Sequence, residues 1–453
     1  MNRRHSAASA LALAAMLIAG GAFAQELIYP IGEGDFSWQA YEDFAANNDF
    51  SGETLTISGA NTGADADRYR NLYAYFAEAT GAEVTYNGSE SFEQDIVIAA
   101  QAGGLPDIAN FPQPGLAKDL ARQGILKPFG GDLASFVADT YAAGQSWADL
   151  ATFEGPDGNS DIYGLFFGTD VKSLVWYSPA AFDEAGYDIP ESMEELKELT
   201  QQIVDDGGTP WCIGLGSGAA TGWPATDWVE DFMLRTATPE QYDAWVANEL
   251  KFDDPIVVNA IKEFGWFARN ADYVSGGPEA VASTDFRDSP AGLFEIPPGC
   301  YMHRQASFIP IFFAEDVEVG TDVDFFYFPA YEGEDLGRPV LGSGGLTTMT
   351  TDSPVARAFV DFLGTPIAHE IMMAQGQFLT PHTSANKDIY TTDTQRALGD
   401  ILTSATTFRF DGSDLMPGEI GTSAFWTGMV DYVTGTSAED VAAAIQERWD
   451  SIQ

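Results

Sequence analysis

ETLTISGANTGADADRYRNLYAYFAEATGAEVTYNG, residues Glu53–Gly88, holds two candidate strands with a helix between them. Apolar and hydroxyl-bearing side chains alternate over residues 53–59, which is the two-residue period of a strand with one buried face. Over residues 68–80 the apolar side chains recur every three to four positions, as on one face of a helix. Residues 82–88 resume a strand pattern. This order predicts two parallel strands joined by a crossover helix.

The same alternation continues along the chain. Helices are predicted over residues 91–103 and 115–124, with a strand at 107–111 between them. A later helix begins at Ser192, which forms a capping box with Glu195. We therefore expect an α/β fold with a largely parallel sheet. Further strand candidates lie at residues 162–167, 173–177, 211–215, 292–296, 323–328 and 340–350.

The N-terminal residues have the pattern of a secretory signal. Arg3 and Arg4 precede the apolar run Leu11–Ala19, and residues 22–24 supply the small side chains of a cleavage site. We predict a signal peptide over residues 1–24. The alternative is an N-terminal membrane anchor, but the apolar run is shorter than the about 18 residues that mark a membrane span. No cysteine lies near the cleavage point, so we expect a periplasmic protein without a lipid anchor.

Acidic residues dominate the charge. The chain has 68 Asp and Glu against 21 Lys and Arg, for a net charge of −47 at pH 7. A surface this negative repels nucleic acid and anionic lipid, so no nucleic-acid partner is expected. It also disfavours a strongly anionic ligand unless nearby Arg or Lys side chains override the field. With 45% hydrophobic residues, the chain can still bury a substantial core.

Cys212 and Cys300 are the two cysteines of the chain. In an oxidising compartment an isolated pair favours a disulfide, which would close a loop of roughly 90 residues and stabilise the fold by about 4–5 kcal/mol. The alternative is a pair of buried free thiols. Without suitable histidines nearby, the two cysteines do not predict a zinc site.

Three short motifs resemble cofactor or metal sites, but the residues around each of them exclude such a site. GLGSGA at residues 214–219 resembles a dinucleotide loop, but the glycine and proline that follow prevent an immediate helix. His369-Glu370 lacks the second histidine of a metalloprotease helix. DGNSD at residues 157–161 begins like a calcium loop and lacks its later glycine and glutamate. We therefore expect no cofactor and no metal. Paired carboxylates keep a secreted glycoside hydrolase open as the enzyme alternative.

Three longer segments, taken together, resemble extracellular solute-binding proteins of carbohydrate ABC importers, the group that includes maltose-binding protein. They are Gly103–Phe129, Asp161–Leu199 and Ser353–Pro381, and the terminal residues 424–445 are similar to the last helix pair of that group. The resemblance covers nearly all of residues 52–453. The N-terminal lead-in, the cysteine pair and a segment rich in glycine and tryptophan look most like the α-glucoside-binding branch.

This resemblance implies two α/β lobes, each with a doubly wound sheet flanked by helices, joined by a hinge around a ligand cleft. A lead-in would occupy residues 25–51. The first lobe would comprise residues 52–168 and 332–381, and the second would comprise residues 169–331 and 382–453. Chain crossings are expected near residues 167–172, 328–332 and 379–382.

A sugar ring stacks its apolar C–H faces on aromatic rings and pairs its hydroxyls with planar polar groups. TPWCIGLGSGAATGWPATDW, residues 209–228, combines three tryptophans with glycines that allow close backbone approach. We expect Trp223 to stack on the ligand and Asp227 to bind hydroxyls, whereas Trp211 and Trp228 also suit the core. Position and the resemblance add the ligand-contact candidates Asn61, Thr62, Asp65, Glu90, Phe111, Gln113, Asp170, Lys172, Arg304, Gly344, Gly345 and Trp426.

Several of these candidates also have a purely structural interpretation. The loop at residues 61–65 has ordinary turn chemistry, and Glu90 suits a helix cap. Lys172 could form a hinge salt bridge with an acidic neighbour. Trp426 could pack between the last two helices, and Arg304 could pair with a surface acid.

The resemblance implies a substrate-binding component that captures an α-glucoside or a similar di- or oligosaccharide and performs no catalysis. Its partners would be the carbohydrate and, transiently, the transmembrane subunits of an ABC permease. The protein itself is expected to be a monomer. A polyol or a glycerophosphodiester is the alternative ligand.

Overall fold

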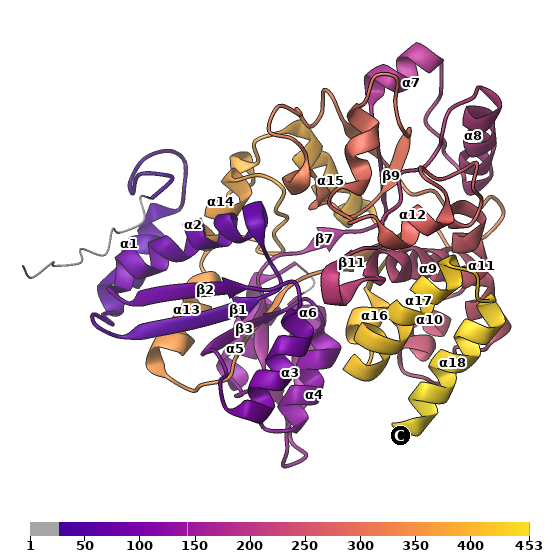
Figure 1. Ribbon diagram of the computed structural model, residues 1–453. Coiled ribbons are helices and arrows are strands. Elements are labelled where there is room, and N and C mark those ends of the chain that lie inside the picture. The colour runs from indigo at the N-terminus through magenta and orange to yellow at the C-terminus, as the bar shows by residue number, and fades with distance from the viewer. Residues whose placement is uncertain (1–26, 143, 453) are drawn as a thin grey trace, which may run out of the picture.

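The computed structural model describes residues 27–142 and 144–452. Two lobes lie side by side, with the indigo first part of the chain in one lobe and the yellow C-terminal helices in the other (Figure 1). The predicted signal peptide, and the alternative of a membrane anchor, fall outside the described residues. Within the part of the chain that is described, no helix is both long enough and apolar enough to cross a membrane.

A five-stranded sheet in the order β2-β1-β3-β12-β6 forms the centre of the first lobe. β1 pairs in parallel with β2 and with β3, which confirms the parallel strands predicted from residues 53–111. β12 runs antiparallel to β3 and β6, because the chain enters it where β3 ends, with Leu346 opposite Phe111. The sheet is therefore mixed. Its strands are β1 (Thr54–Gly59), β2 (Glu83–Gly88), β3 (Ile108–Phe111), β6 (Gly164–Phe166) and β12 (Leu346–Met349).

Helices cover both faces of this sheet, with α1 and α2 on one side and α3 and α4 on the other (Figure 1). The alternating Leu55 and Ile57 of β1 are fully buried, as are Phe76 of α2 and Phe359 of α13. The remaining bounds are α1 (Trp38–Asn47), α2 (Gly63–Thr80), α3 (Phe92–Ala102), α4 (Pro114–Arg122), α5 (Gly131–Thr140), α6 (Gly144–Leu150), β4 (Thr152–Glu154), β5 (Ser160–Ile162), α13 (Pro354–Leu363) and α14 (Pro366–Ala374).

The lead-in is part of the first lobe. Trp38 and Tyr41 of α1 pack on Tyr75 of α2. The buried carboxylate of Glu370 on α14 accepts hydrogen bonds from the backbone and hydroxyl of Ser37, at 2.6 and 2.7 Å. The lead-in therefore covers the outer face of this lobe.

The second lobe has a smaller sheet, β10-β8-β9, whose pairs are both antiparallel. The predicted strand at 211–215 is reduced to bridges of Trp211 with Val274 and Met302. Residues 289–294 form a 3-10 helix instead of the strand predicted at 292–296, where two following prolines lack the donors a ladder needs. The bounds are β8 (Leu174–Tyr177), β9 (Met302–Arg304), β10 (Asp324–Tyr327), α7 (Pro179–Ala185), α8 (Met193–Asp205), α9 (Trp223–Thr236), α10 (Pro239–Val246), α11 (Pro255–Ala268), α12 (Pro278–Ser283), α16 (Gly412–Leu415), α17 (Trp426–Val433) and α18 (Ala438–Ser451).

Trp211 and Trp228 lie in the core of the second lobe, with ring centroids 5.3 Å apart. Both also contact Phe267. Cys212 and Cys300 form the predicted disulfide, with a Cα–Cα distance of 5.5 Å, and both are buried. The disulfide fixes the segment that leads into α9.

A third sheet, β13-β11-β7, joins the lobes. β7 (Asp170–Val171) follows β6 directly, near the first predicted crossing, and β11 (Pro339–Ser343) leads directly into β12. The chain thus enters the first-lobe sheet after Ser343, later than the crossing expected at 328–332. β13 (Thr407–Phe410) follows α15 (Asp393–Ser404) and completes this sheet. The predicted lobe boundaries stay a prediction.

Candidate binding site

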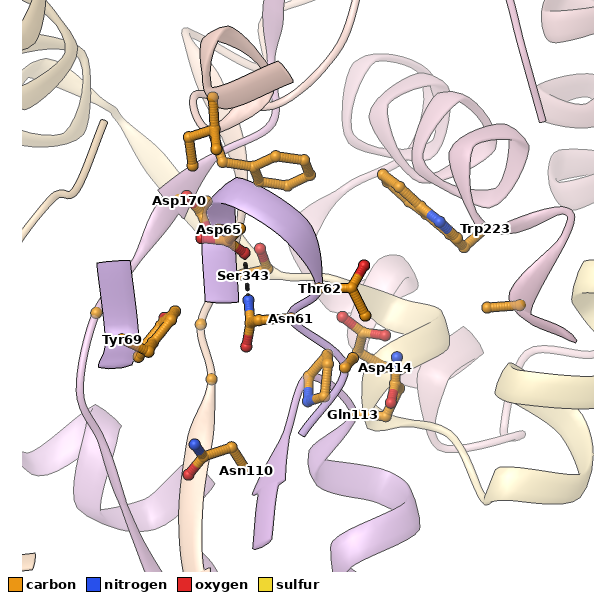
Figure 2. Close-up of a pocket in the computed structure, with 18 of the residues that line it drawn as sticks. Asn61, Thr62, Asp65, Tyr69, Asn110, Gln113, Asp170, Trp223, Ser343 and Asp414 are labelled. Carbon is orange, nitrogen blue, oxygen red and sulfur yellow. Dashed lines mark hydrogen bonds between the residues drawn. The ribbon is translucent and has the colours of Figure 1, made fainter. Parts of the chain in front are cut away.

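A cavity of about 240 Å³ lies between the two lobes and takes its walls from both. Figure 2 shows side chains from the loop after β1 and from α2 facing Trp223 of α9 across it. The lining residues are Ala60, Asn61, Thr62, Asp65, Arg68, Tyr69, Tyr73, Glu90, Glu93, Asn110, Pro112, Gln113, Phe167, Gly168, Thr169, Asp170, Lys172, Ser217, Ala220, Trp223, Asp227, Phe286, Arg287, Phe308, Ile311, Phe312, Ser343, Gly344, Gly345, Thr347, Leu363, Gln377, Phe378, Asp411, Ser413 and Asp414.

The first-lobe wall is polar. Asn61 follows β1 and donates a hydrogen bond from its amide to Asp65 in the first turn of α2 (Figure 2). Burial raises the pKa of Asp65, and Arg68, 3.4 Å away, opposes that rise. Asn110 at the end of β3 donates to the Tyr73 hydroxyl at 3.0 Å, while its amide oxygen is buried without a partner among the described residues. This wall offers unused hydrogen-bonding capacity to a ligand.

The second-lobe wall is aromatic. The ring of Trp223 meets Phe286 edge-on at 4.9 Å and lies 6.1 Å from Phe308. Phe312 extends the cluster from Phe286 at 5.5 Å. Such a surface suits the apolar face of a ligand.

Charged side chains form the base of the cavity. The ammonium of Lys172 lies 2.9 Å from Asp227 and 2.5 Å from Asp411. Burial opposes the charge of Lys172, but these carboxylates outweigh that effect and hold its pKa well above the usual range. Burial raises the pKa of Asp227 to about 7. It also raises the pKa values of Glu230 and Asp414 well above their usual range, which favours their neutral forms.

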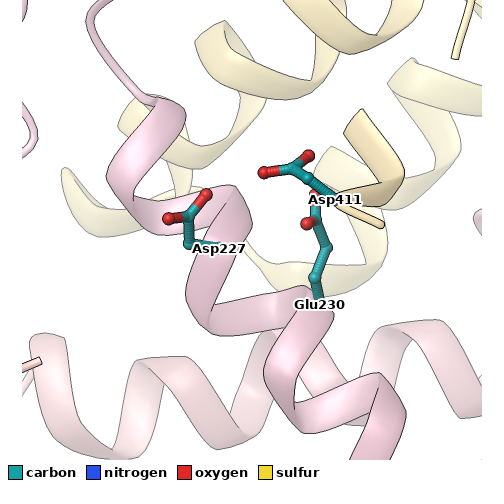
Figure 3. A group of neighbouring side chains, drawn as sticks. All are labelled: Asp227, Glu230 and Asp411. Atoms are coloured by element: carbon teal, nitrogen blue, oxygen red, sulfur yellow. The ribbon is translucent and has the colours of Figure 1, made fainter. Parts of the chain in front are cut away.

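Asp227, Glu230 and Asp411 bring carboxylate oxygens within 4.8 Å of one another. Figure 3 shows the three side chains grouped together. Oxygen ligands at this spacing could hold a hard cation. Lys172 already supplies a positive charge to two of the three, and the backbone amide of Ser413 donates to Glu230 at 2.9 Å. The arrangement is a buried ion-pair network in which the Lys172 ammonium is the cation.

The structure brings most of the predicted ligand contacts together around this cavity. Lys172 also forms the hinge salt bridge that was its structural alternative. Gly344 approaches the first lobe so closely that a Cβ would lie 2.6 Å from the Gly168 carbonyl oxygen, so a larger residue does not fit. The predicted residues that line the cavity are Asn61, Thr62, Asp65, Glu90, Gln113, Asp170, Lys172, Trp223, Asp227, Gly344 and Gly345.

Three predicted contacts do not line the cavity. Phe111 is fully buried and packs on Phe92, because its neighbour in β3, Asn110, takes the outward position. Arg304 is buried and donates to the Asp227 carbonyl at 2.9 Å and to the Asp231 carboxylate, so its partners are buried acids. Trp426 is buried at the start of α17, which agrees with its packing alternative. These three serve the fold in this conformation.

Several residues that line the cavity were not predicted from the sequence. Arg287 lies 3.3 Å from Glu90 and so joins the two lobes beside the cavity. Asn110 had a usable signal, because it is a polar residue one position before the end of the predicted strand at 107–111, and Asn61 likewise lies near the end of a strand. The aromatic residues after residue 280 come from segments without clear periodicity, and no pattern pointed to them. The missed residues with a polar or aromatic side chain are Arg68, Tyr69, Tyr73, Glu93, Asn110, Phe167, Thr169, Ser217, Phe286, Arg287, Phe308, Phe312, Ser343, Thr347, Gln377, Phe378, Asp411, Ser413 and Asp414.

Two α/β lobes with a cavity lined from both sides define a two-lobed binding protein. Residues 59–370 match the model of the bacterial extracellular solute-binding protein family, and the chain belongs to that family. Its members are binding proteins of transporters and not enzymes.

Two relatives extend the match over most of the chain. The chain is 59% identical to the alpha-glucosides-binding periplasmic protein AglE of Rhizobium meliloti (strain 1021), over 92% of each chain. It is 41% identical to the osmoprotective compounds-binding protein GgtB of Synechocystis sp., over 89% of this chain and 94% of that one.

Solved structures share the fold at low sequence identity. The solute receptor AcbH superposes with a TM-score of 0.74 at 18% identity, covering 88% of this chain and 99% of that one. Maltose-bound MalE3 of T. maritima superposes with a TM-score of 0.68 at 15% identity, covering 88% of this chain and all of that one (100%). These likenesses confirm the expected two-lobed α/β fold.

Proposed function

We propose that this protein is the periplasmic substrate-binding component of an ABC importer and captures a neutral α-glucoside or a similar di- or oligosaccharide between its lobes. The observation that carries the proposal is the pairing of an aromatic wall at Trp223 and Phe286 with a polar wall at Asn61, Asp65 and Asn110. A sugar presents apolar faces and hydroxyl edges together, and this cavity offers a matching surface to each.

The charges of the lining support a neutral ligand. Each of its three cationic side chains has a carboxylate partner. Arg68 pairs with Asp65, Lys172 with Asp227 and Asp411, and Arg287 with Glu90 and Asp285. An anionic ligand would have to compete with these partners inside a negatively charged protein. This disfavours the glycerophosphodiester alternative and leaves a polyol as the second candidate ligand.

The relatives point in the same direction. The protein that is 59% identical is named for binding alpha-glucosides, and the more distant one, at 41%, for binding osmoprotective compounds. We assign this chain to the ligand class of the nearer of the two. Trp223 would stack on a sugar ring, and Asn61, Asp65, Gln113 and Asp170 would bind hydroxyls.

The remaining expectations complete the proposal. Removal of residues 1–24 would release the mature protein into the periplasm without a lipid anchor. The monomer would close on its ligand, because the ligand binds the closed state better, and would then dock transiently on the permease subunits.

A thermal-shift screen of ligand-stripped mature protein tests the function. The panel contains maltose, sucrose, trehalose, glucose, a polyol and glycerophosphocholine, and each sugar is checked afterwards for hydrolysis. A ligand at 100 times its dissociation constant adds about 2.7 kcal/mol to the free energy of unfolding. Stabilisation by an intact disaccharide is the expected result. No shift with any sugar refutes the assignment, and glucose released from a disaccharide would contradict a role limited to binding.

A further inference from the structure

Gln377 has an unusual backbone conformation at the wall of the cavity. Its φ is 48°, and among the described residues only Asn248, with φ 61°, shares a positive φ without being glycine. Asparagine visits this region comparatively often because its short side chain bonds locally, whereas glutamine has no such advantage. Glycine would fit position 377 without strain, as the preceding Gly376 does with φ 83°. The presence of glutamine there needs a reason.

The surroundings hold Gln377 in this conformation from both sides. Arg68 on α2 donates to the carbonyl of Gly376. The backbone amide of Thr169 donates to the carbonyl of Leu379 at 3.0 Å. Phe378 packs on Phe167 with centroids 5.1 Å apart. A strained residue persists only where its neighbours fix it in this way, and such residues gather at ligand sites.

The side chain of Gln377 has hydrogen-bonding capacity to spare. Its amide oxygen is buried, and within residues 27–142 and 144–452 it has no hydrogen-bond partner. The residue lines the cavity together with Asn110 and Gln113, whose amide oxygens are likewise buried and unpaired. Three residues that line one cavity thus each carry an unpaired amide oxygen. Buried polar groups are rarely left without a partner, so a partner from the ligand is indicated.

We propose that Gln377 determines ligand specificity by exchanging hydrogen bonds with a hydroxyl group of the sugar, at the first-lobe end of the cavity. This inference rests on the proposed function, because it needs a polyhydroxyl ligand. It adds a residue outside the loop after β1, and it explains why strain is kept at a position where glycine would fit.

Gln377→Gly separates this role from a purely structural one. Glycine accepts the backbone conformation, so the melting temperature of the ligand-free protein should stay the same or rise. The dissociation constant for the best binder among maltose, sucrose and trehalose, measured by titration calorimetry, should rise at least about tenfold, as for the loss of one hydrogen bond in a desolvated site. Gln377→Ala, which keeps the strain and loses the amide, should weaken binding equally.

Asn248→Gly is the matched control, because it relieves the same backbone conformation away from the cavity. It should leave the dissociation constant unchanged. Single-deoxy analogues of the best binder identify the hydroxyl, since one analogue should bind the Gln377→Ala protein as well as it binds the wild type.

Three results decide the matter. Weakened binding in both Gln377 variants, with Asn248→Gly unaffected, supports the inference. Wild-type affinity in either Gln377 variant overturns it and leaves the proposed function intact. A wild-type protein that binds none of the sugars overturns the proposed function and this inference with it.

Discussion

The ammonium of Lys172 lies 2.5 Å from a carboxylate oxygen of Asp411, and the two residues follow different passages of the chain between the lobes. Lys172 comes directly after β7 and Asp411 directly after β13, and both strands pair with β11. The ion pair therefore fastens two hinge segments to each other below the cavity. The Lys172 ammonium also lies 2.9 Å from the Asp227 carboxylate on α9, so the second lobe takes part in the same ion-pair network.

Replacing Lys172 with methionine should destabilise the protein strongly. The variant leaves Asp411 buried without its cation and leaves Asp227 with only Arg304, 3.6 Å away. Breaking a buried pair in this way typically costs about 3–5 kcal/mol. Urea unfolding at pH 7 measures the loss. Lys197→Met is the control, because the side chains of Lys197 and Glu263 are 25% and 24% exposed. A partly exposed pair contributes about 1 kcal/mol or less. Equal losses in the two variants would contradict the assigned role of Lys172.

Replacing Trp223 with alanine should weaken sugar binding. The variant removes the ring proposed to stack on the ligand, and a loss of about 2 kcal/mol corresponds to a roughly thirtyfold rise in the dissociation constant. Titration calorimetry with the best-binding disaccharide tests this. Trp266→Ala is the control, since Trp266 packs on Phe267 and Tyr273 in the second lobe. Unchanged affinity in Trp223→Ala would show that the aromatic wall does not contact the ligand.

The stability of the protein should depend on pH through Asp170. Burial raises its pKa from 3.8 to about 6 in the folded state. The folded state therefore holds a proton that the unfolded state has released between about pH 4 and pH 6, so this residue's contribution to stability falls as the pH rises through that window. A shift of this size corresponds to roughly 3 kcal/mol.

Asp170→Asn isolates this contribution from the other carboxyls. The variant keeps a side chain that can bond Ser307, which donates to Asp170 at 3.2 Å. Urea unfolding of both proteins from pH 4 to 8 should show the wild type losing stability relative to the variant as the pH rises to about 6. Parallel pH profiles would mean that Asp170 titrates normally.

Reduction of the Cys212–Cys300 disulfide should lower the free energy of unfolding by about 4–5 kcal/mol, because the bridge spans 88 residues. Unfolding of the Cys212→Ser, Cys300→Ser double variant and of the wild type, each with and without dithiothreitol, measures the effect. Only the wild type should respond to the reductant. An unresponsive wild type would mean that the bridge contributes little beyond packing.

The fold was predictable where local periodicity and tertiary position agreed. Alternation identified β1, and the amphipathic pattern identified the helix that follows it. The second lobe was harder to predict. β8 and β10 are one and two residues shorter than the predicted runs, and the run at 211–215 is replaced by single bridges at Trp211. β12 is antiparallel to its neighbours because of where the chain returns from the other lobe. No local sequence pattern carries that information.

The candidate site was predictable where a polar residue follows a strand, as Asn61 does. Phe111, a candidate from the family resemblance, shows how such a prediction depends on strand register. Side chains alternate along a strand, so an error of one position exchanges a cavity residue for a core residue. Here Asn110 lines the cavity and Phe111 packs in the core. The strain at Gln377 could not be predicted either, because φ follows from contacts with α2 and residue 169 that are distant in sequence.

The ion pair between Glu90 and Arg287 has a consequence for kinetics. The two side chains join the lobes beside the cavity, and the Glu90 side chain is 50% exposed, so dissolved salt screens their attraction. If ligand entry requires this pair to part, the association rate constant of a neutral sugar should increase with ionic strength. Stopped-flow tryptophan fluorescence can measure it. The Glu90→Gln variant should have a high association rate constant at every salt concentration. A wild-type rate constant that does not change with salt would mean that the sugar enters elsewhere.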